Sequence, residues 1–169
     1  MIRRISIAAV ILTSLLCSPA NAMKVGDRAP DFVRDDLANK PVRLSGYHGK
    51  LVLLNFWATW CPPCREEMPA FSKWQRDYGS ERLQILGVSM DDDVTSVKEF
   101  LNKHPVSYPI VMGDAKLAET FGGVLGLPVS FLIDEQGRVV ARYQGQQDLP
   151  KIEAALKERL SRTRNTANE

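Results

Sequence analysis

The chain is 169 residues long and close to charge balance, with 22 Lys and Arg residues, 20 Asp and Glu residues and a formal net charge of +2. Removal of Arg3 and Arg4 with the leader segment described next brings the formal charge of the remaining chain to zero. A neutral chain has no electrostatic footprint for nucleic acid, so the composition excludes that class of partner.

Residues 1–22 have the pattern of a secretion signal. Arg3 and Arg4 are basic, residues 5–16 are apolar but too few to span a bilayer comfortably, and Ala20-Asn21-Ala22 fits a cleavage site. We therefore expect cleavage after Ala22 and export to the periplasm, with no permanent membrane insertion.

One of the three cysteines, Cys17, lies inside this leader. Lipidation of Cys17 would make the protein a lipoprotein, but Leu16 stands where that signal needs a small residue. The predicted mature chain, 23–169, has 147 residues, which is enough for one domain with a proper core. We place this domain at 23–162 and a flexible polar tail at 163–169.

The first half of the mature chain is predicted to form a hairpin, a strand and a long helix. Short strand-like pieces at 31–34 and 41–44 flank a turn and indicate an N-terminal β-hairpin extension. Residues 51–57 are almost continuously apolar, as in a buried parallel strand. Helical character follows over 63–78 and ends at Gly79.

The second half alternates between strand and helix patterns. Strands are predicted at 83–89, 108–112, 129–133 and 139–143, and helices at 93–102, 115–121 and 149–160. We interpret the acidic run 91–93 as a solvated loop with a helix N-cap. This alternation predicts an α/β fold with a central mixed β-sheet flanked by helices.

The segment Trp60-Cys61-Pro62-Pro63-Cys64 joins a predicted strand to a predicted helix. With Cys17 removed, Cys61 and Cys64 are the only cysteines left, and so close a pair in an oxidising compartment indicates a redox-active disulfide. A helix N-terminus favours a thiolate through its unpaired N–H groups and positive dipole end. We expect Cys61 to be the exposed nucleophile, nearest to the amides of Cys64 and Arg65, and Cys64 to be the buried resolving thiol.

Metal binding is the main alternative for this spacing of cysteines. A zinc site normally needs a second pair of ligands, and His48 and His104 form no paired motif. No histidine follows Cys64, so the pair is not a haem-attachment site. We therefore expect no metal and no cofactor other than the Cys61–Cys64 disulfide itself.

Three segments of the chain resemble the TlpA/ResA/DsbE-like thiol:disulfide oxidoreductases, a secreted, membrane-associated branch of the thioredoxin superfamily. They are Val25–Phe32, Asn55–Pro69 and Gly126–Asp134, and the similarity extends from about residue 25 to about residue 160. The resemblance implies a thioredoxin-like fold and a reductase of specific periplasmic disulfides, which we expect to be a monomer. It also implies a membrane-embedded thiol donor as reductant, and cytochrome c maturation is the commonest assignment in the family.

The same resemblance implies that Pro128 is a cis proline beside the cysteine pair. A Leu-Pro bond just before a core strand is a place where cis geometry can be locked. This loop would leave backbone groups of Leu127 free to pair with the extended chain of a substrate. Trp60, with Pro62 and Pro63, is predicted to shape the docking surface.

Proton handling is expected to differ from that of cytosolic thioredoxins. Asn55 stands where those proteins have a buried aspartate that accepts a proton from the resolving thiol, and asparagine cannot titrate. Glu67 is the candidate replacement, since it lies one helical turn after Cys64 on the same side. Burial against the apolar stripe of the helix would raise its pKa and let it exchange protons with the cysteines near neutral pH. ResA-like proteins carry a functional glutamate at this spacing; a solvated residue, like Glu66, is the alternative.

Other functions stay open at this point. A periplasmic disulfide oxidase or isomerase would use the same cysteine pair. A peroxiredoxin shares the framework around 26–32, but Leu54 and Ala58 occupy the proline and Thr/Ser positions of its reactive-cysteine motif. Copper-handling modules of related fold usually have a wider cysteine spacing and a supporting histidine, and a zinc module needs further ligands.

Overall fold

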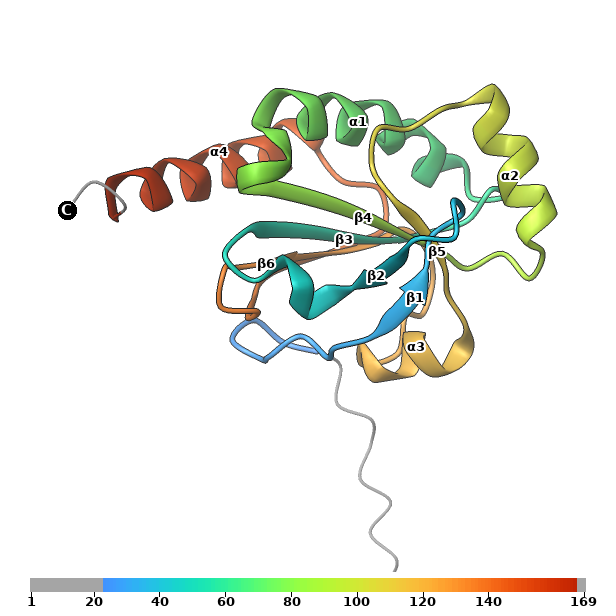
Figure 1. Cartoon of the computed structure of the whole chain (residues 1–169), viewed down its shortest axis with the longest axis horizontal. Helices are drawn as coiled ribbons and strands as arrows, with labels where there is room; N and C mark the ends of the chain where they lie inside the picture. Colours follow the sequence, from blue (N-terminus) through green and yellow to red (C-terminus); the bar gives the residue numbers. More distant parts are fainter. Residues whose placement is uncertain (1–22, 167–169) are drawn as a thin grey trace, which may run out of the picture.

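A five-stranded mixed sheet forms the centre of the protein in the computed structural model, which describes residues 23–166 (Figure 1). The strand order is β5-β4-β3-β6-β7, in which β3 pairs in parallel with β4 and antiparallel with β6. The strands are β3 (Leu51–Trp57), β4 (Leu83–Ser89), β5 (Ile110–Met112), β6 (Val129–Ile133) and β7 (Val139–Gln144). A separate antiparallel pair, β1 (Val33–Asp35) and β2 (Pro41–Arg43), precedes them. The predicted thioredoxin-like architecture with an N-terminal hairpin is confirmed.

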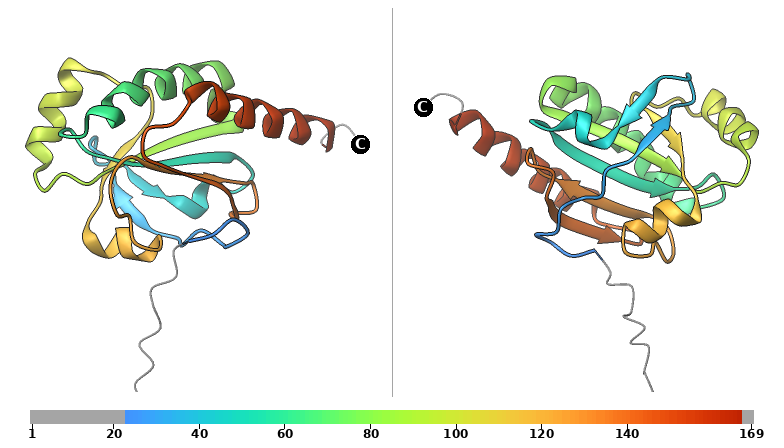
Figure 2. Two further views of the ribbon diagram at one scale, coloured as in Figure 1. Left: turned by 180° about the vertical axis from the view of Figure 1, so that it is seen from behind. Right: turned by 60° about the horizontal axis from the view of Figure 1, so that its bottom comes forward.

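Helices cover both faces of the sheet (Figures 1 and 2). They are α1 (Pro62–Arg82), α2 (Val94–Lys103), α3 (Ala115–Thr120) and α4 (Leu149–Thr166), with a 3-10 turn, η1 (Leu44–Tyr47), after the hairpin. Side chains of α1, α2 and α4 pack on one face, around Leu51, Leu53 and Trp57 of β3. Side chains of β2, η1 and α3 pack on the other, around Val52, Leu54 and Phe56. Alternate residues of β3 therefore serve opposite cores, which explains its continuous apolar run.

The ends of two helices differ from the sequence prediction. Gly79 has a φ of 67° and breaks the regular part of α1 as expected, but the chain stays coiled to Arg82 before it enters β4. Helix α4 continues to Thr166, so its backbone includes the first residues of the predicted polar tail. The predicted signal, residues 1–22, lies outside the described residues. Within residues 23–166 no helix is long and apolar enough to cross a membrane.

Candidate active site

The two cysteines form a disulfide at the point where β3 gives way to α1. A turn closed by a hydrogen bond from the Cys61 N–H to the Ala58 carbonyl (3.2 Å) leads out of the strand. Cys61 is the N-cap of α1, and its Sγ accepts the N–H of Cys64 at 3.4 Å. The Arg65 N–H instead donates to the Cys61 carbonyl. One backbone donor of the helix N-terminus is thus aimed at the sulfur of Cys61, where it favours a negative charge.

The exposure of Cys61 is the main difference from the predicted site. Cys61 is 3 % exposed and Cys64 1 %, and both belong to the core cluster beneath α1. The prediction of an exposed Cys61 is therefore wrong for the disulfide form, because Cys61 belongs to a core cluster that also includes residues distant in the chain, such as Tyr108 and Ile110. What meets solvent here is Trp60, which is 66 % exposed, and Pro62.

Glu67 is drawn into the core one turn after Cys64. The residue is 3 % exposed, and this burial raises the pKa of Glu67 from its ordinary 4.5 to about 7. A backbone N–H of Gln147 opposes the rise in pKa, and the charge of Glu66 adds to it. Glu66 itself is exposed and accepts a hydrogen bond from the Gln146 side chain at 3.0 Å. Two adjacent glutamates therefore have different environments, and burial sets Glu67 to titrate near neutral pH.

The loop before β6 lies at the same edge of the sheet as the disulfide. Val129 is opposite Phe56 in the β3–β6 pair, which places Pro128 level with the end of β3. The Leu127–Pro128 peptide bond is cis. The Pro128 carbonyl accepts the Gly145 N–H at 2.8 Å, whereas the backbone N–H and carbonyl of Leu127 have no partner among residues 23–166. An extended chain laid along this loop would find a free donor and a free acceptor.

Asn55 lies in the middle of β3, buried below this edge. Its side-chain amide donates to the Ser130 hydroxyl at 2.9 Å, and both residues are buried. A neutral pair therefore occupies this part of the core, so any proton exchange with the cysteines falls to another group.

Sequence reasoning missed Asp91. The sequence predicts a solvated loop for the whole acidic run, and the structure shows solvent exposure for Asp92 and for Asp93, which caps α2. Asp91 is only 8 % exposed and accepts hydrogen bonds from both the backbone and the hydroxyl of Thr59. Nothing in the local sequence shows which of three consecutive aspartates is buried. The available signal is the polar residue Thr59, because it follows β3 at the edge of the sheet where Asp91 follows the parallel strand β4.

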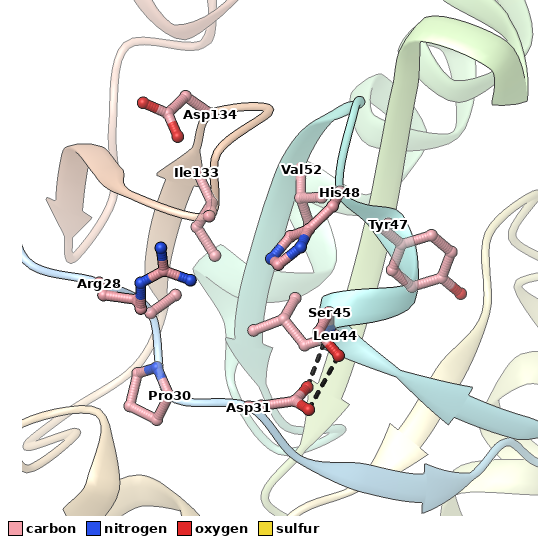
Figure 3. Close-up of a pocket in the computed structure, with 12 residues that line it drawn as sticks. Arg28, Pro30, Asp31, Leu44, Ser45, Tyr47, His48, Val52, Ile133 and Asp134 are labelled. Atoms are coloured by element: carbon pink, nitrogen blue, oxygen red, sulfur yellow. Dashed lines mark hydrogen bonds between the residues drawn. The ribbon is translucent and has the colours of Figure 1, made fainter.

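A separate cavity of about 280 Å³ lies near the start of β3 (Figure 3). It is lined by Val52 and Ile133, which pair in register, and by Arg28 and His48. Val52 is five residues from the end of β3, or about 17 Å at the rise of an extended strand. The cavity is therefore at the opposite edge of the sheet from the disulfide.

Chelating clusters are not found in the described part of the chain: no group of three His, Cys, Asp or Glu side chains there could hold a metal ion. Cys61 and Cys64 are joined to each other in a disulfide.

Comparison with known proteins agrees with this geometry. Residues 25–142 match the model of the AhpC/TSA family. The chain belongs to the AhpC/TSA family. Within it, the chain is 36% identical over 141 residues to thiol-disulfide oxidoreductase ResA of Bacillus cereus, covering 83% of this chain and 81% of that protein. Over 118 residues it is 40% identical to ResA of Geobacillus thermodenitrificans, covering 70% and 68%.

Solved structures give the same result for this AhpC/TSA family member. A thiol:disulfide interchange protein DsbE from Chlorobium tepidum, described as putative, superposes with a TM-score of 0.74 and 31% identity, covering 84% of this chain and 99% of that one. The predicted relationship to ResA- and DsbE-like proteins is confirmed, and the protein is a thiol-disulfide oxidoreductase with a Cys-x-x-Cys pair, Cys61 and Cys64, joined in a disulfide.

Proposed function

We propose that the protein is an exported reductase of disulfides in periplasmic proteins, with Glu67 carrying the proton of the resolving thiol. The observation that carries this proposal is the buried Glu67 carboxyl, with a pKa of about 7, one helical turn beyond Cys64. A group that exchanges protons near neutral pH at this place can serve a dithiol that must lose and regain protons in each cycle.

The cycle begins with the dithiol form. The Cys61 thiolate attacks one sulfur of the partner's disulfide; the partner's sulfur–sulfur bond breaks, a mixed disulfide forms, and the released thiolate takes a proton. Cys64 then loses its proton to Glu67 and attacks the Cys61 sulfur. The Cys61–Cys64 bond forms and the second partner sulfur leaves as a thiolate, which is protonated in turn. The partner gains two electrons and two protons, and the dithiol becomes the observed disulfide.

Partner docking is assigned to the surface around Cys61. Trp60 and Pro62 are exposed beside the disulfide, with Pro63 partly exposed behind them. The free backbone groups of Leu127, next to Pro128, are suited to an extended segment of the partner. An unfolded or loop segment that carries a disulfide fits this arrangement.

The wider setting follows from the resemblance and from the leader. Export rests on the signal pattern of residues 1–22, and the return of Cys61 and Cys64 to the dithiol form is assigned to a membrane-embedded thiol donor. We place the protein in cytochrome c maturation, where a Cys-x-x-Cys disulfide of the apocytochrome must be reduced before haem attachment.

The decisive measurement is the reduction potential of the Cys61–Cys64 pair, obtained by equilibration with dithiol buffers of known potential. A reductase requires a value well below that of a strong oxidant such as DsbA, about −120 mV, and a value at or above that level would make the protein an oxidase. Reduction of a synthetic Cys-x-x-Cys-His disulfide peptide, compared with the same peptide in which the histidine is replaced by alanine, tests the substrate. A stable mixed disulfide between this peptide and the Cys64→Ala variant would identify Cys61 as the attacking thiol.

A further inference from the structure

Asp91 is a buried carboxyl whose partners are all neutral. Its two oxygens accept hydrogen bonds from the Thr59 backbone N–H at 3.0 Å, the Thr59 hydroxyl at 2.5 Å and the Ser89 hydroxyl at 2.8 Å. None of the ion pairs between described residues involves it. Burying a carboxyl without a cation is costly, and such a group normally has a defined task.

The group that Asp91 holds is the turn that leads into the active site. Thr59 is the second residue of the turn Ala58–Cys61, which is closed by the Cys61 N–H on the Ala58 carbonyl. Met90, which precedes Asp91, is also hydrogen-bonded to the segment before Cys61: its backbone N–H donates to the Trp57 carbonyl at 2.8 Å. The loops that follow the parallel strands β3 and β4 are therefore joined at two points, immediately before Cys61.

The importance of this connection depends on the redox state. In the disulfide form, the sulfur–sulfur bond itself fixes Cys61 against α1. Reduction removes that covalent link, and Cys61 is then placed by the turn that precedes it and by the first turn of the helix. A Cys61 thiolate gains from the Cys64 N–H only while it stays at the helix N-terminus.

We propose that Asp91 is a positioning residue for the thiol-disulfide exchange: through Thr59, it holds Cys61 at the N-terminus of α1 in the dithiol form. The inference rests on Cys61 as the attacking thiol but not on the identity of the partner. It is independent of Glu67, which acts on the proton of Cys64.

The test uses the full chain with Cys64→Ala, so that alkylation of the Cys61-containing peptide, followed by mass spectrometry, reports one thiol. Asp91→Ala removes the acceptor of both Thr59 bonds. We expect its alkylation rate at pH 7 to fall about tenfold, with the pH midpoint shifted upward by about one unit. Asp91→Asn keeps an acceptor for the Thr59 N–H and an amide for the hydroxyls, and should stay within about twofold of the parent. Asp92→Ala, an exposed neighbour in the same loop, is the matched control and should change nothing.

Two results would overturn the proposal. Equal acceleration in Asp91→Ala and Asp91→Asn would mean that Asp91 acts through its charge, because loss of a nearby negative charge favours the thiolate. An unchanged pH profile in Asp91→Ala, even with a lower melting temperature, would mean that the residue serves stability alone. If Asp91→Ala does not fold, Thr59→Val replaces it: a roughly threefold slower alkylation is expected on loss of one of the two bonds, and no change refutes the idea. By contrast, a parent Cys61 no more reactive than a free thiol would count against the proposed function, whatever the Asp91 variants do.

Discussion

The two edges of the central sheet contain similar residue types in different environments. Where β3 ends, the carboxyls of Glu67 and Asp91 are buried beside a disulfide, and exposed Trp60 marks the surface above them. Where β3 begins, a cavity is lined by the exposed side chains of Arg28, Asp31 and His48 and by half-buried Asp134. The two edges therefore differ in the burial of their carboxyls, and burial raises the pKa of a carboxyl as it does for Glu67.

Of the substitutions at the two edges, Cys61→Ser should have the largest effect on the rate of disulfide reduction. Removal of the attacking thiol is expected to lower the rate of disulfide reduction by about a thousandfold or more, since a hydroxyl cannot replace the thiolate. His48→Ala at the opposite edge serves as the control and should leave this rate unchanged. Both variants can be followed by thiol-dependent reduction of a disulfide peptide. A large loss in the His48 variant would show that the cavity takes part in the reaction.

Glu67→Gln tests whether the buried glutamate differs in function from its exposed neighbour at the edge of the sheet that carries the disulfide. Loss of the group that accepts the Cys64 proton should slow the release of the mixed disulfide by about a hundredfold at pH 7 and flatten its pH dependence between about 6 and 8. Glu66→Gln is the matched control: Glu66 is adjacent but exposed, so its loss should keep the pH dependence and move its midpoint slightly downward, since the Glu66 charge adds to the raised pKa of Glu67. Stopped-flow measurement of mixed-disulfide decay across this pH range gives both readouts. Identical profiles for the two variants would refute a proton-transfer role for Glu67.

The same substitution should also change how stability depends on pH. Folding raises the pKa of Glu67 from 4.5 to about 7, so between these pH values the folded protein keeps a proton that the unfolded chain releases. The contribution of this residue to the free energy of unfolding therefore decreases as the pH rises through that window, by about 3 kcal/mol at about 1.4 kcal/mol for each pKa unit, and is level above it. Glu67→Gln should remove this slope. Urea unfolding of the oxidised protein at pH 5 and pH 8 measures it, and an equal slope in the variant would mean that Glu67 is not the titrating group.

The smallest effect is expected at the rim of the cavity. Gly137 has a φ of 78°, and a Cβ there would meet the end of the exposed His48 side chain at 2.8 Å. His48 can move aside, so Gly137→Ala should cost mainly the strained backbone, about 1 kcal/mol of unfolding free energy. Disulfide reduction should proceed at the parent rate. Thermal unfolding combined with the peptide assay checks both points; normal stability with slower reduction would contradict the separation of the two edges.

Several features of the site were predictable because their signals are local. The apolar run of β3, the cysteine pair at the start of α1 and the glutamate one turn later are all encoded by neighbours in the chain. The burial of Glu67 followed from the apolar stripe of its own helix, although the covering segment around Gln147 did not. The burial of Asp91 and the burial of Cys61 were not predicted, since both depend on residues that pack against them from elsewhere in the chain.

The order of residues in the chain was enough to predict the α/β class, the cysteine pair at the start of α1 and the candidate proton carrier, because hydrophobic period, helix capping and residue spacing act over a few positions. The three-dimensional packing decided which of three consecutive aspartates is buried, since Thr59 lies 32 residues before Asp91 and meets it only because β3 and β4 run in parallel. Packing also decided that both sulfurs are covered while Trp60 is not. Burial is a property of neighbours brought together by the fold, and it is burial that distinguishes the Glu67 carboxyl, with its raised pKa, from a carboxyl at the surface.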